Sequence, residues 1–267
     1  MNVFQYLTYA YPDADVEPMD FVNALHIGAD GWVGNWLTIA LAVIFGLLVY
    51  IFPIIIMETE HVGPYPLWLH CFYCAADFMG IWVFIHAWNI TDHFLLFLLL
   101  AIGEAVWVAM EIFCLQRAVT FEADINFEKG ASMKKKLTTV VVETLGFYLG
   151  LNMLRFEWHD STMWKFWIFT QVLITTIPVF EMKKRGYKSG NALILNITFI
   201  CVALVSFNPW ANMWLVIKPE FFSFSANPWY YLMGLYCLVV AIYGVYLYKK
   251  LPAKEDIMGC GKKPALK

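Results

Sequence analysis

Long apolar stretches dominate the chain, and short polar segments separate them. A helix needs roughly 17 to 25 apolar residues to cross the hydrocarbon core of a bilayer, which is about 30 Å thick. Stretches of that length fall near residues 34–57, 66–88, 93–115, 137–157, 164–182, 191–217 and 229–248. The pattern therefore predicts an all-α, polytopic membrane protein with seven transmembrane helices.

The basic residues predict how these spans are oriented. Fifteen of the 18 Lys and Arg residues lie at or beyond the ends of the third, fifth and seventh spans, whereas residues 1–33 contain five acids and no base. Basic loops tend to stay in the cytoplasm, so we expect the N-terminus outside and the C-terminus inside. Residues 34–250 then form the seven-helix domain, and residues 251–267 form a basic cytoplasmic tail.

Residues 1–33 are expected to form an outer interfacial segment. Their aromatic side chains suit the headgroup layer, where amphipathic rings settle; they are Phe4, Tyr6, Tyr9, Tyr11, Phe21 and Trp32. No basic region precedes an apolar stretch at the start of the chain, so no cleavable signal peptide is expected.

Composition excludes several classes of protein. Apolar residues make up 61% of the chain, charged residues only 15%, and the mean hydropathy is +0.61, which rules out a water-soluble globule. A net charge of −3 offers no basic stripe for nucleic acid.

The expected partners are membrane lipids and an apolar substrate. The sequence does not predict an oligomeric state. The host membrane is the plasma membrane in a bacterium or the endoplasmic reticulum in a eukaryote.

Two acids fall almost at the predicted bilayer centre. An ionisable group is energetically costly at that depth, so its presence there points to a function. Asp77 is the twelfth residue of the second predicted span, and Glu104 is the twelfth of the third. A short turn between these spans makes the helices antiparallel neighbours, so the two carboxyls are expected at similar depth. In so dry a place the charged form is disfavoured, and we expect at least one acid to stay protonated.

A neutral carboxylic acid in an apolar cavity is a proton donor, and its partner can accept or position a proton. Asp77 and Glu104 are therefore the predicted catalytic residues, with either one as the acid. The alternative is an interhelical hydrogen bond that only joins the two spans. Aromatic and polar side chains of the second, third and fourth spans are the predicted substrate-binding set: His70, Tyr73, Trp82, Trp107, Glu111, Glu143, Tyr148 and Arg155. Ring faces stabilise cations, and Arg155 is placed to meet lipid headgroups or an anionic substrate.

No metal and no cofactor are predicted. Cys71 and Cys74 form a C-x-x-C pair near His70, but there is no second such pair, and free cysteines in apolar stretches usually pack as small hydrophobes. Two predicted outer turns are rich in metal-ligand types, which is also common in exposed loops; these residues are His86, Asp92, His93, Glu157, His159 and Asp160.

The layout resembles the small seven-span integral-membrane terpene cyclases of fungal meroterpenoid and indole-diterpene pathways. The resemblance rests on chain size, the Gly/Pro-rich loop 58–66 leading into an acid-bearing span, and a last span that ends with residues 243–246 before Lys249 and Lys250. It implies protonation of a prenylated substrate by one acid in the second span and one in the last. Asp77 matches the first acid in place but not in type, and the last span contains no carboxylate.

The leading hypothesis is a membrane-embedded enzyme of lyase or isomerase type that cyclises or isomerises an apolar isoprenoid-type substrate. Mid-bilayer carboxylates and histidines also build the proton relays of transporters, so a proton-coupled carrier is a second hypothesis. A non-catalytic subunit that binds lipid or a partner helix is a third. An enclosed cavity around Asp77 and Glu104 favours the enzyme, a water-filled pore the carrier, and a flat polar face the subunit.

Overall fold

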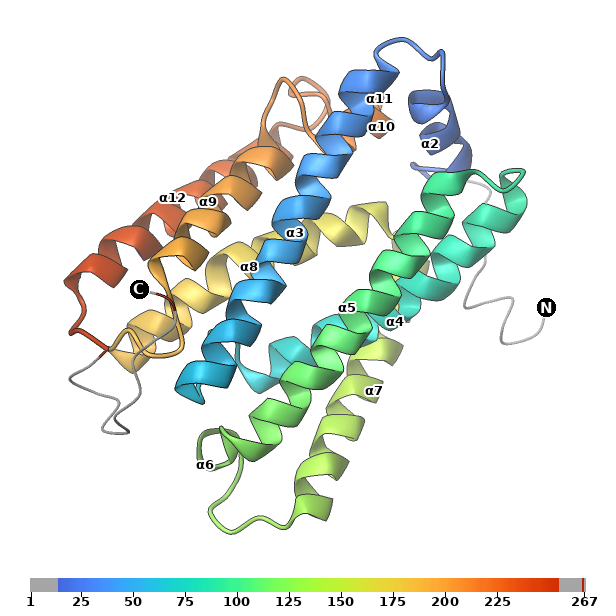
Figure 1. Ribbon diagram of the computed structural model, residues 1–267. Coiled ribbons are helices and arrows are strands. Elements are labelled where there is room, and N and C mark those ends of the chain that lie inside the picture. Colours follow the sequence, from blue (N-terminus) through green and yellow to red (C-terminus); the bar gives the residue numbers. More distant parts are fainter. Residues whose placement is uncertain (1–13, 255–265, 267) are drawn as a thin grey trace.

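The computed structural model describes residues 14–254 and residue 266. Across these residues the regular structure is entirely helical (Figure 1). The long helices are α3 (Trp32–Glu60), α4 (Leu67–Ile90), α5 (Leu95–Thr120), α7 (Met133–Glu157), α8 (Trp164–Arg185), α9 (Leu193–Phe207) and α12 (Pro228–Lys250). The short ones are α2 (Pro18–Leu25), α6 (Ala123–Asn126), α10 (Met213–Ile217) and α11 (Pro219–Phe222).

Each predicted span overlaps one of the long helices, and the sixth extends well beyond it. Five of the helices in the described part of the chain are long and apolar enough to cross a membrane, namely α3, α4, α5, α7 and α12. This indicates a membrane protein. The helix α8 does not meet this criterion of length and apolar composition. The helix α9 is apolar but has only 15 residues, which span about 22 Å.

The sixth predicted span, residues 191–217, is not one continuous helix. The helix α9 ends at Phe207, and Asn208 adopts an extended backbone with a ψ of 126°. Pro209 follows, and proline disfavours the helical conformation in the residue before it. The chain then turns and re-enters helix at Met213, where the Asn212 side chain accepts hydrogen bonds from the first backbone N–H groups of α10.

The long helices form two packed groups. In one group α4 pairs with α5 along its length and packs on its other side against α7, while in the second α9 and α8 pack against α12. The helix α3 lies between the groups, against α9 and, over a shorter stretch, against α5 (Figure 1). This arrangement leaves the middle of α3 facing both the acid-bearing pair α4/α5 and the helix α8.

The expectation that residues 1–33 lie in the headgroup layer is wrong for Phe21. This ring is fully buried in the protein, 5.2 Å from the ring of Phe97 and 4.7 Å from that of Trp164. Asp20 of α2 pairs with Lys218 at 2.8 Å. Trp32 is the first residue of α3 and is half-buried. The other four predicted interfacial aromatics, Phe4, Tyr6, Tyr9 and Tyr11, lie outside the described residues.

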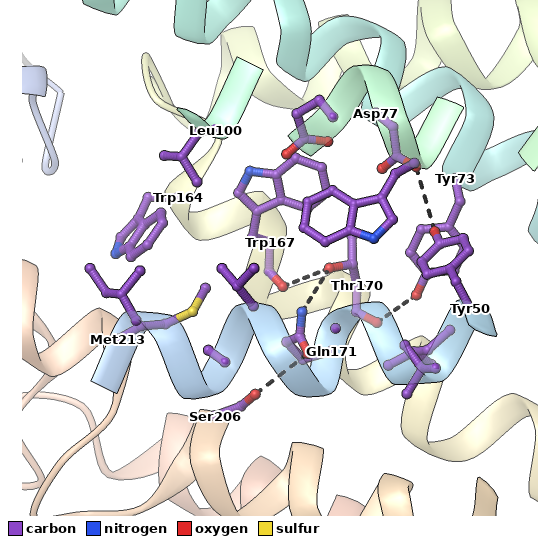
Figure 2. A pocket seen from close by; sticks show the side chains of 18 of the residues that line it. Tyr50, Tyr73, Asp77, Leu100, Trp164, Trp167, Thr170, Gln171, Ser206 and Met213 are labelled. Carbon is purple, nitrogen blue, oxygen red and sulfur yellow. Dashed lines mark hydrogen bonds between the residues drawn. The ribbon is translucent and has the colours of Figure 1, made fainter. Parts of the chain in front are cut away.

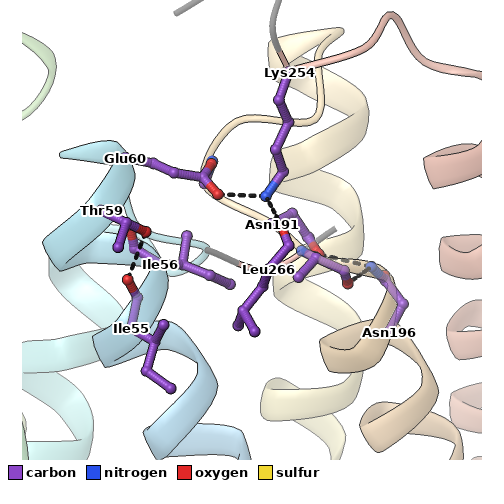
Figure 3. Close-up of polar contacts among 10 residues, drawn as sticks. Ile55, Ile56, Thr59, Glu60, Asn191, Asn196, Lys254 and Leu266 are labelled. Atoms are coloured by element: carbon purple, nitrogen blue, oxygen red, sulfur yellow. Dashed lines mark hydrogen bonds and ion pairs between the residues drawn. The ribbon is translucent and has the colours of Figure 1, made fainter. Parts of the chain in front are cut away.

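The predicted basic tail contains a buried lysine. Lys254 forms an ion pair with Glu60, the last residue of α3, and donates to the carbonyl of Leu266 at 3.0 Å (Figure 3). The second oxygen of Glu60 accepts from the backbone N–H of Gly190 at 2.9 Å. Burial lowers the pKa of Lys254 despite the neighbouring carboxylate. The end of α3 is thus tied both to the α8–α9 loop and to the C-terminal segment.

Candidate functional site

A cavity of about 110 Å³ lies among α3, α4, α5 and α8, with one edge at the end of α9 (Figure 2). Its lining is mainly apolar and aromatic. The aromatic lining residues are Tyr50, Tyr73, Phe84, Trp107, Trp164 and Trp167. Asp77 and Glu104 are the two carboxyl-bearing residues in that lining, so any molecule in the cavity meets hydrocarbon, ring faces and two acids.

Asp77 reaches the cavity from α4 and is only 2% exposed. The Tyr50 hydroxyl, from α3, donates to Asp77 Oδ2 over a long 3.5 Å. Tyr73, one turn before Asp77 on α4, instead donates to the backbone carbonyl of Thr170 on α8 at 2.7 Å (Figure 2). The two tyrosines therefore join the acid-bearing helix to α3 on one side and to α8 on the other.

Glu104 reaches the cavity from α5 and is 3% exposed. Its carboxyl lies against Gly80 of α4, because a Cβ atom added to that glycine would come within 2.9 Å of Glu104 Cδ. Glu104 Oε2 has no hydrogen-bond partner among the described residues. A buried oxygen without a partner carries a desolvation penalty, and a proton or a bound ligand would relieve it.

The two carboxyls are close enough to hydrogen-bond to each other when one of them carries a proton. Two carboxylates cannot both be charged at such range without strong repulsion in a dry site. One proton shared between the two acids would relieve this repulsion. Chemically, the pair then supplies one proton donor and one base on the wall of the same apolar cavity.

A second pair of polar groups lies two helical turns away on the same two helices. His70 Nδ1 is 2.6 Å from Glu111 Oε2, and each residue is only 1% exposed. Both predicted binding residues are outside the cavity lining, because they face each other across the α4/α5 contact. The spacing of seven residues on each helix places this pair about 10 Å from the carboxyl pair.

The remaining predicted binding residues divide between the cavity and other surroundings. Trp107 and Tyr73 line the cavity. Trp82 is 47% exposed and packs edge-on against Phe78, whose other neighbour is Tyr148. Glu143 is half-buried on α7. Trp82, Glu143 and Tyr148 are therefore not part of the cavity that contains the two acids.

Arg155 is buried within the protein, contrary to the expectation that it reaches lipid headgroups. Its guanidinium donates to the backbone carbonyls of Asp160 at 3.0 Å and Ser161 at 3.2 Å, which fixes the α7–α8 turn. In that turn Asp160 Oδ2 accepts from the N–H of Phe166 at 2.8 Å. Burial raises the pKa of Asp160, although Arg155 and that hydrogen bond act in the opposite direction.

Sequence reasoning missed the part of the cavity contributed by α8 and α9. Thr170 Oγ1 donates to the carbonyl of Trp167, Gln171 Nε2 approaches Thr170 Oγ1 at 3.5 Å, and Ser206 Oγ donates to Gln171 Oε1 at 3.4 Å (Figure 2). These groups form a polar strip opposite the carboxyls. Their signal was the adjacent Thr170 and Gln171 within an otherwise apolar stretch.

Comparison of the chain with protein-family models, with curated proteins and with solved structures gave no match.

Proposed function

We propose that this protein is a membrane-embedded enzyme that carries out an acid-initiated cyclisation or isomerisation of an apolar, isoprenoid-type substrate. The observation that supports this most is the joint placement of Asp77 and Glu104, two buried carboxyls from neighbouring helices, on the wall of one apolar cavity. Isomerases and lyases of this kind need a proton donor that hydrocarbon can reach and water cannot.

The proposed reaction begins with transfer of the shared proton to a double bond or an epoxide oxygen of the substrate. The acid becomes a carboxylate, and the substrate becomes a carbocation. Ring closure then uses the π electrons of the substrate itself, and loss of a proton to a carboxylate of the pair forms a new double bond. The proton that leaves the product restores the pair, so the cycle consumes no co-reactant.

The aromatic lining supports a cationic intermediate. Ring faces attract cations by roughly 0.5 to 2 kcal/mol each, with the larger values where water is absent. Tyr50, Trp107 and Trp167 come from three different helices and all line the cavity that contains the two carboxyls. An intermediate formed beside Asp77 and Glu104 would lie among these rings.

Lateral entry from the lipid is proposed at the seam between α3 and α5. Trp107 lines the cavity and is also partly exposed on the outer surface of the protein. Its indole therefore separates the cavity from that surface. A Cβ atom added to Gly46 of α3 would lie 3.5 Å from the Trp107 ring, so the indole packs directly against the α3 backbone. A cavity of about 150 Å³ holds a benzene-sized molecule; the present one therefore suits roughly one isoprene unit, with the rest of the substrate extending through this seam.

The proposed topology has seven crossings with the N-terminus outside. It is supported by seven long helices in the described residues and by the positions of basic residues. Arg117 lies near the end of α5, Lys134 near the start of α7, and Lys183 near the end of α8, which places all three on one side of an antiparallel series. The tie between Glu60 and Lys254 brings the end of α3 to that same side.

The test begins with mass spectrometry of lipids that copurify with the protein, followed by incubation with the isoprenoid class found there. Separate Asp77→Asn and Glu104→Gln variants should each lower turnover by about 10²–10⁴-fold while the protein remains folded. Glu143→Gln is the matched control, because this carboxyl lies on α7 outside the cavity. Full activity in both cavity variants would refute the proposal, and pH-driven substrate uptake into vesicles would favour a transporter instead.

A further inference from the structure

Three potential metal ligands meet at the buried contact between α4 and α5. His70 comes from α4, and Glu111 and Cys114 come from α5. One ligand atom from each residue lies within 4.8 Å of the other two, and all three side chains are buried. Glu111 and Cys114 are three residues apart, which places them on one helix face, opposite His70.

The hydrogen bonding of His70 is incomplete. Its Nδ1 atom lies 2.6 Å from Glu111 Oε2, but its Nε2 atom has no partner among the described residues. The ring of Tyr65 lies edge-on to the imidazole at 5.6 Å, and the hydroxyl of that tyrosine donates to the carbonyl of Val49. Of the two ring nitrogens, Nδ1 is therefore the one directed at the Glu111 carboxylate and available to an ion, and the unpaired Nε2 by itself gives no evidence for one.

We propose that His70, Glu111 and Cys114 form a binding site for a divalent first-row transition-metal ion, with zinc as the best fit. Imidazole nitrogen, carboxylate oxygen and thiolate sulfur are the three donor types that bind Zn²⁺ in proteins. A dication with one carboxylate and one thiolate is electrically neutral as a unit. Neutrality matters here, because an uncompensated charge in this dry contact would be strongly unfavourable.

The geometry needs only small side-chain shifts. Zinc bonds of about 2.0–2.3 Å in a tetrahedral site separate the ligand atoms by roughly 3.3–3.6 Å. The His70–Glu111 contact of 2.6 Å must therefore open by less than about 1 Å, and the sulfur must close from at most 4.8 Å. The ion replaces the proton held between imidazole and carboxylate, and binding also releases the thiol proton. Three protein ligands leave a fourth position open.

This inference does not depend on the proposed isoprenoid chemistry. The metal cluster lies outside the cavity lining and two helical turns from Asp77 and Glu104. Nor does it involve the C-x-x-C pair, since Cys71 Sγ lies 3.9 Å from the carbonyl of Val140 and so faces α7. Cys71 is consequently a matched control for Cys114: both are buried free cysteines, and they lie on adjacent helices.

The test is titration of the purified, chelator-treated full-length protein with Co²⁺. The absorption spectrum of bound Co²⁺ depends on which atoms coordinate it. We expect one equivalent to bind with a thiolate-to-cobalt band in the near ultraviolet, and Zn²⁺ to displace it. Cys114→Ser should abolish the band and Cys71→Ser should retain it. Even outer-shell substitutions weaken metal binding by about 10- to 100-fold, so loss of the Cys114 ligand should weaken Zn²⁺ binding by at least that factor.

Circular dichroism and size-exclusion chromatography establish that each variant is folded. If Cys114→Ser does not fold, Glu111→Gln provides the same comparison with a side chain of equal size, and it should bind Zn²⁺ more weakly than the wild type. The proposal is overturned if the wild type binds neither ion. It is also overturned if the folded variants bind as tightly as the wild type with an unchanged spectrum.

Discussion

Gly80 determines where the Glu104 carboxyl can lie. A Cβ atom at this position would come within 2.9 Å of Glu104 Cδ and 3.2 Å of Oε2, so only glycine leaves the space that the carboxyl now fills. The obstructing atoms belong to the end of a flexible side chain, which can rotate away. Substitution here should therefore move the acid without disrupting the helix pair.

Gly80→Ala should retain the fold and lose catalysis. Alanine favours helix by about 1 kcal/mol over glycine, which offsets the local crowding, so the thermal midpoint should change little. Misplacing a catalytic group by about 1 Å can reduce turnover by about 100-fold. Gly150→Ala is the control, because a Cβ atom added there has open space around it. Equal turnover in the two variants would mean that the position of Glu104 is unimportant.

Asp160 predicts a pH dependence of stability in the α7–α8 turn. Burial raises its pKa above the ordinary 3.8, so the folded state holds this proton more tightly than the unfolded chain. Its contribution to stability is fully present below pH 3.8 and is lost as the pH rises through the folded-state pKa. Asp160→Asn should therefore gain stability relative to wild type as the pH rises from acidic to neutral. Parallel pH profiles of the thermal midpoint would contradict this.

The acids at mid-span were predictable from sequence, and their neighbours were not. Asp77 and Glu104 occupy equal positions in two spans joined by a short turn, which is enough to place them at one depth. The partner of Glu111 depends on how α4 and α5 are rotated against each other, and no single span carries that information. From the sequence alone, Cys114 cannot be distinguished from a small apolar residue, because only the packing of α4 against α5 places it opposite His70.

The helix α2 packs as part of the protein core, through one ring in particular. Phe21 fills a space between Phe97 and Trp164, and with Pro18 and Leu25 it forms the buried face of α2. An aromatic residue in a short N-terminal segment is equally suited to a headgroup layer and to a protein core. Only the tertiary contact with α5 and α8 decides between them.

Phe21→Ala should destabilise the protein by about 3–5 kcal/mol, the usual range for removing a large buried ring. Met19→Ala is the matched control on the same short helix, since Met19 is half exposed, and it should change stability by less than about 0.5 kcal/mol. Denaturation of the purified protein in detergent measures both. A similar small effect for the two variants would show that α2 is not anchored by its phenylalanine.

The break between α9 and α10 illustrates why span lengths were harder to predict than span positions. Hydropathy stays high from Ala192 to Ile217, and only the Asn208–Pro209 step marks the end of the helix. A proline within an apolar stretch either kinks a helix or ends it, depending on the surrounding packing. Here the chain leaves the helix and the Asn212 side chain starts a new one.

Across the whole molecule, the existence and order of the long helices followed from hydrophobic pattern alone. The grouping into α4/α5/α7 and α8/α9/α12, with α3 between them, did not. Span patterns contain no direct record of which helices are neighbours, apart from those joined by short turns. The cavity depends on that grouping, so its far wall on α8 could not be predicted with the acids.

The proposed topology predicts opposite sides for two loops. Three long helices, α7, α8 and α9, lie between Asp124 and Ser225, and both residues are exposed. A membrane-impermeant thiol reagent added to intact cells should label Ser225→Cys above the background of the parent protein. It should label Asp124→Cys only after the membrane is permeabilised. Labelling of both from the same side would show that at least one of α7, α8 and α9 does not cross, which contradicts the proposed topology.

The claim on which the proposed chemistry depends is that Asp77 and Glu104 share a proton inside the protein. Infrared difference spectroscopy of the purified protein at neutral pH measures this without a substrate. We predict a carbonyl stretch from a protonated carboxylic acid that the Asp77→Asn, Glu104→Gln double variant lacks and that Glu143→Gln retains. An identical acid signal in the wild type and the folded double variant, or no such signal in the wild type, would contradict the account.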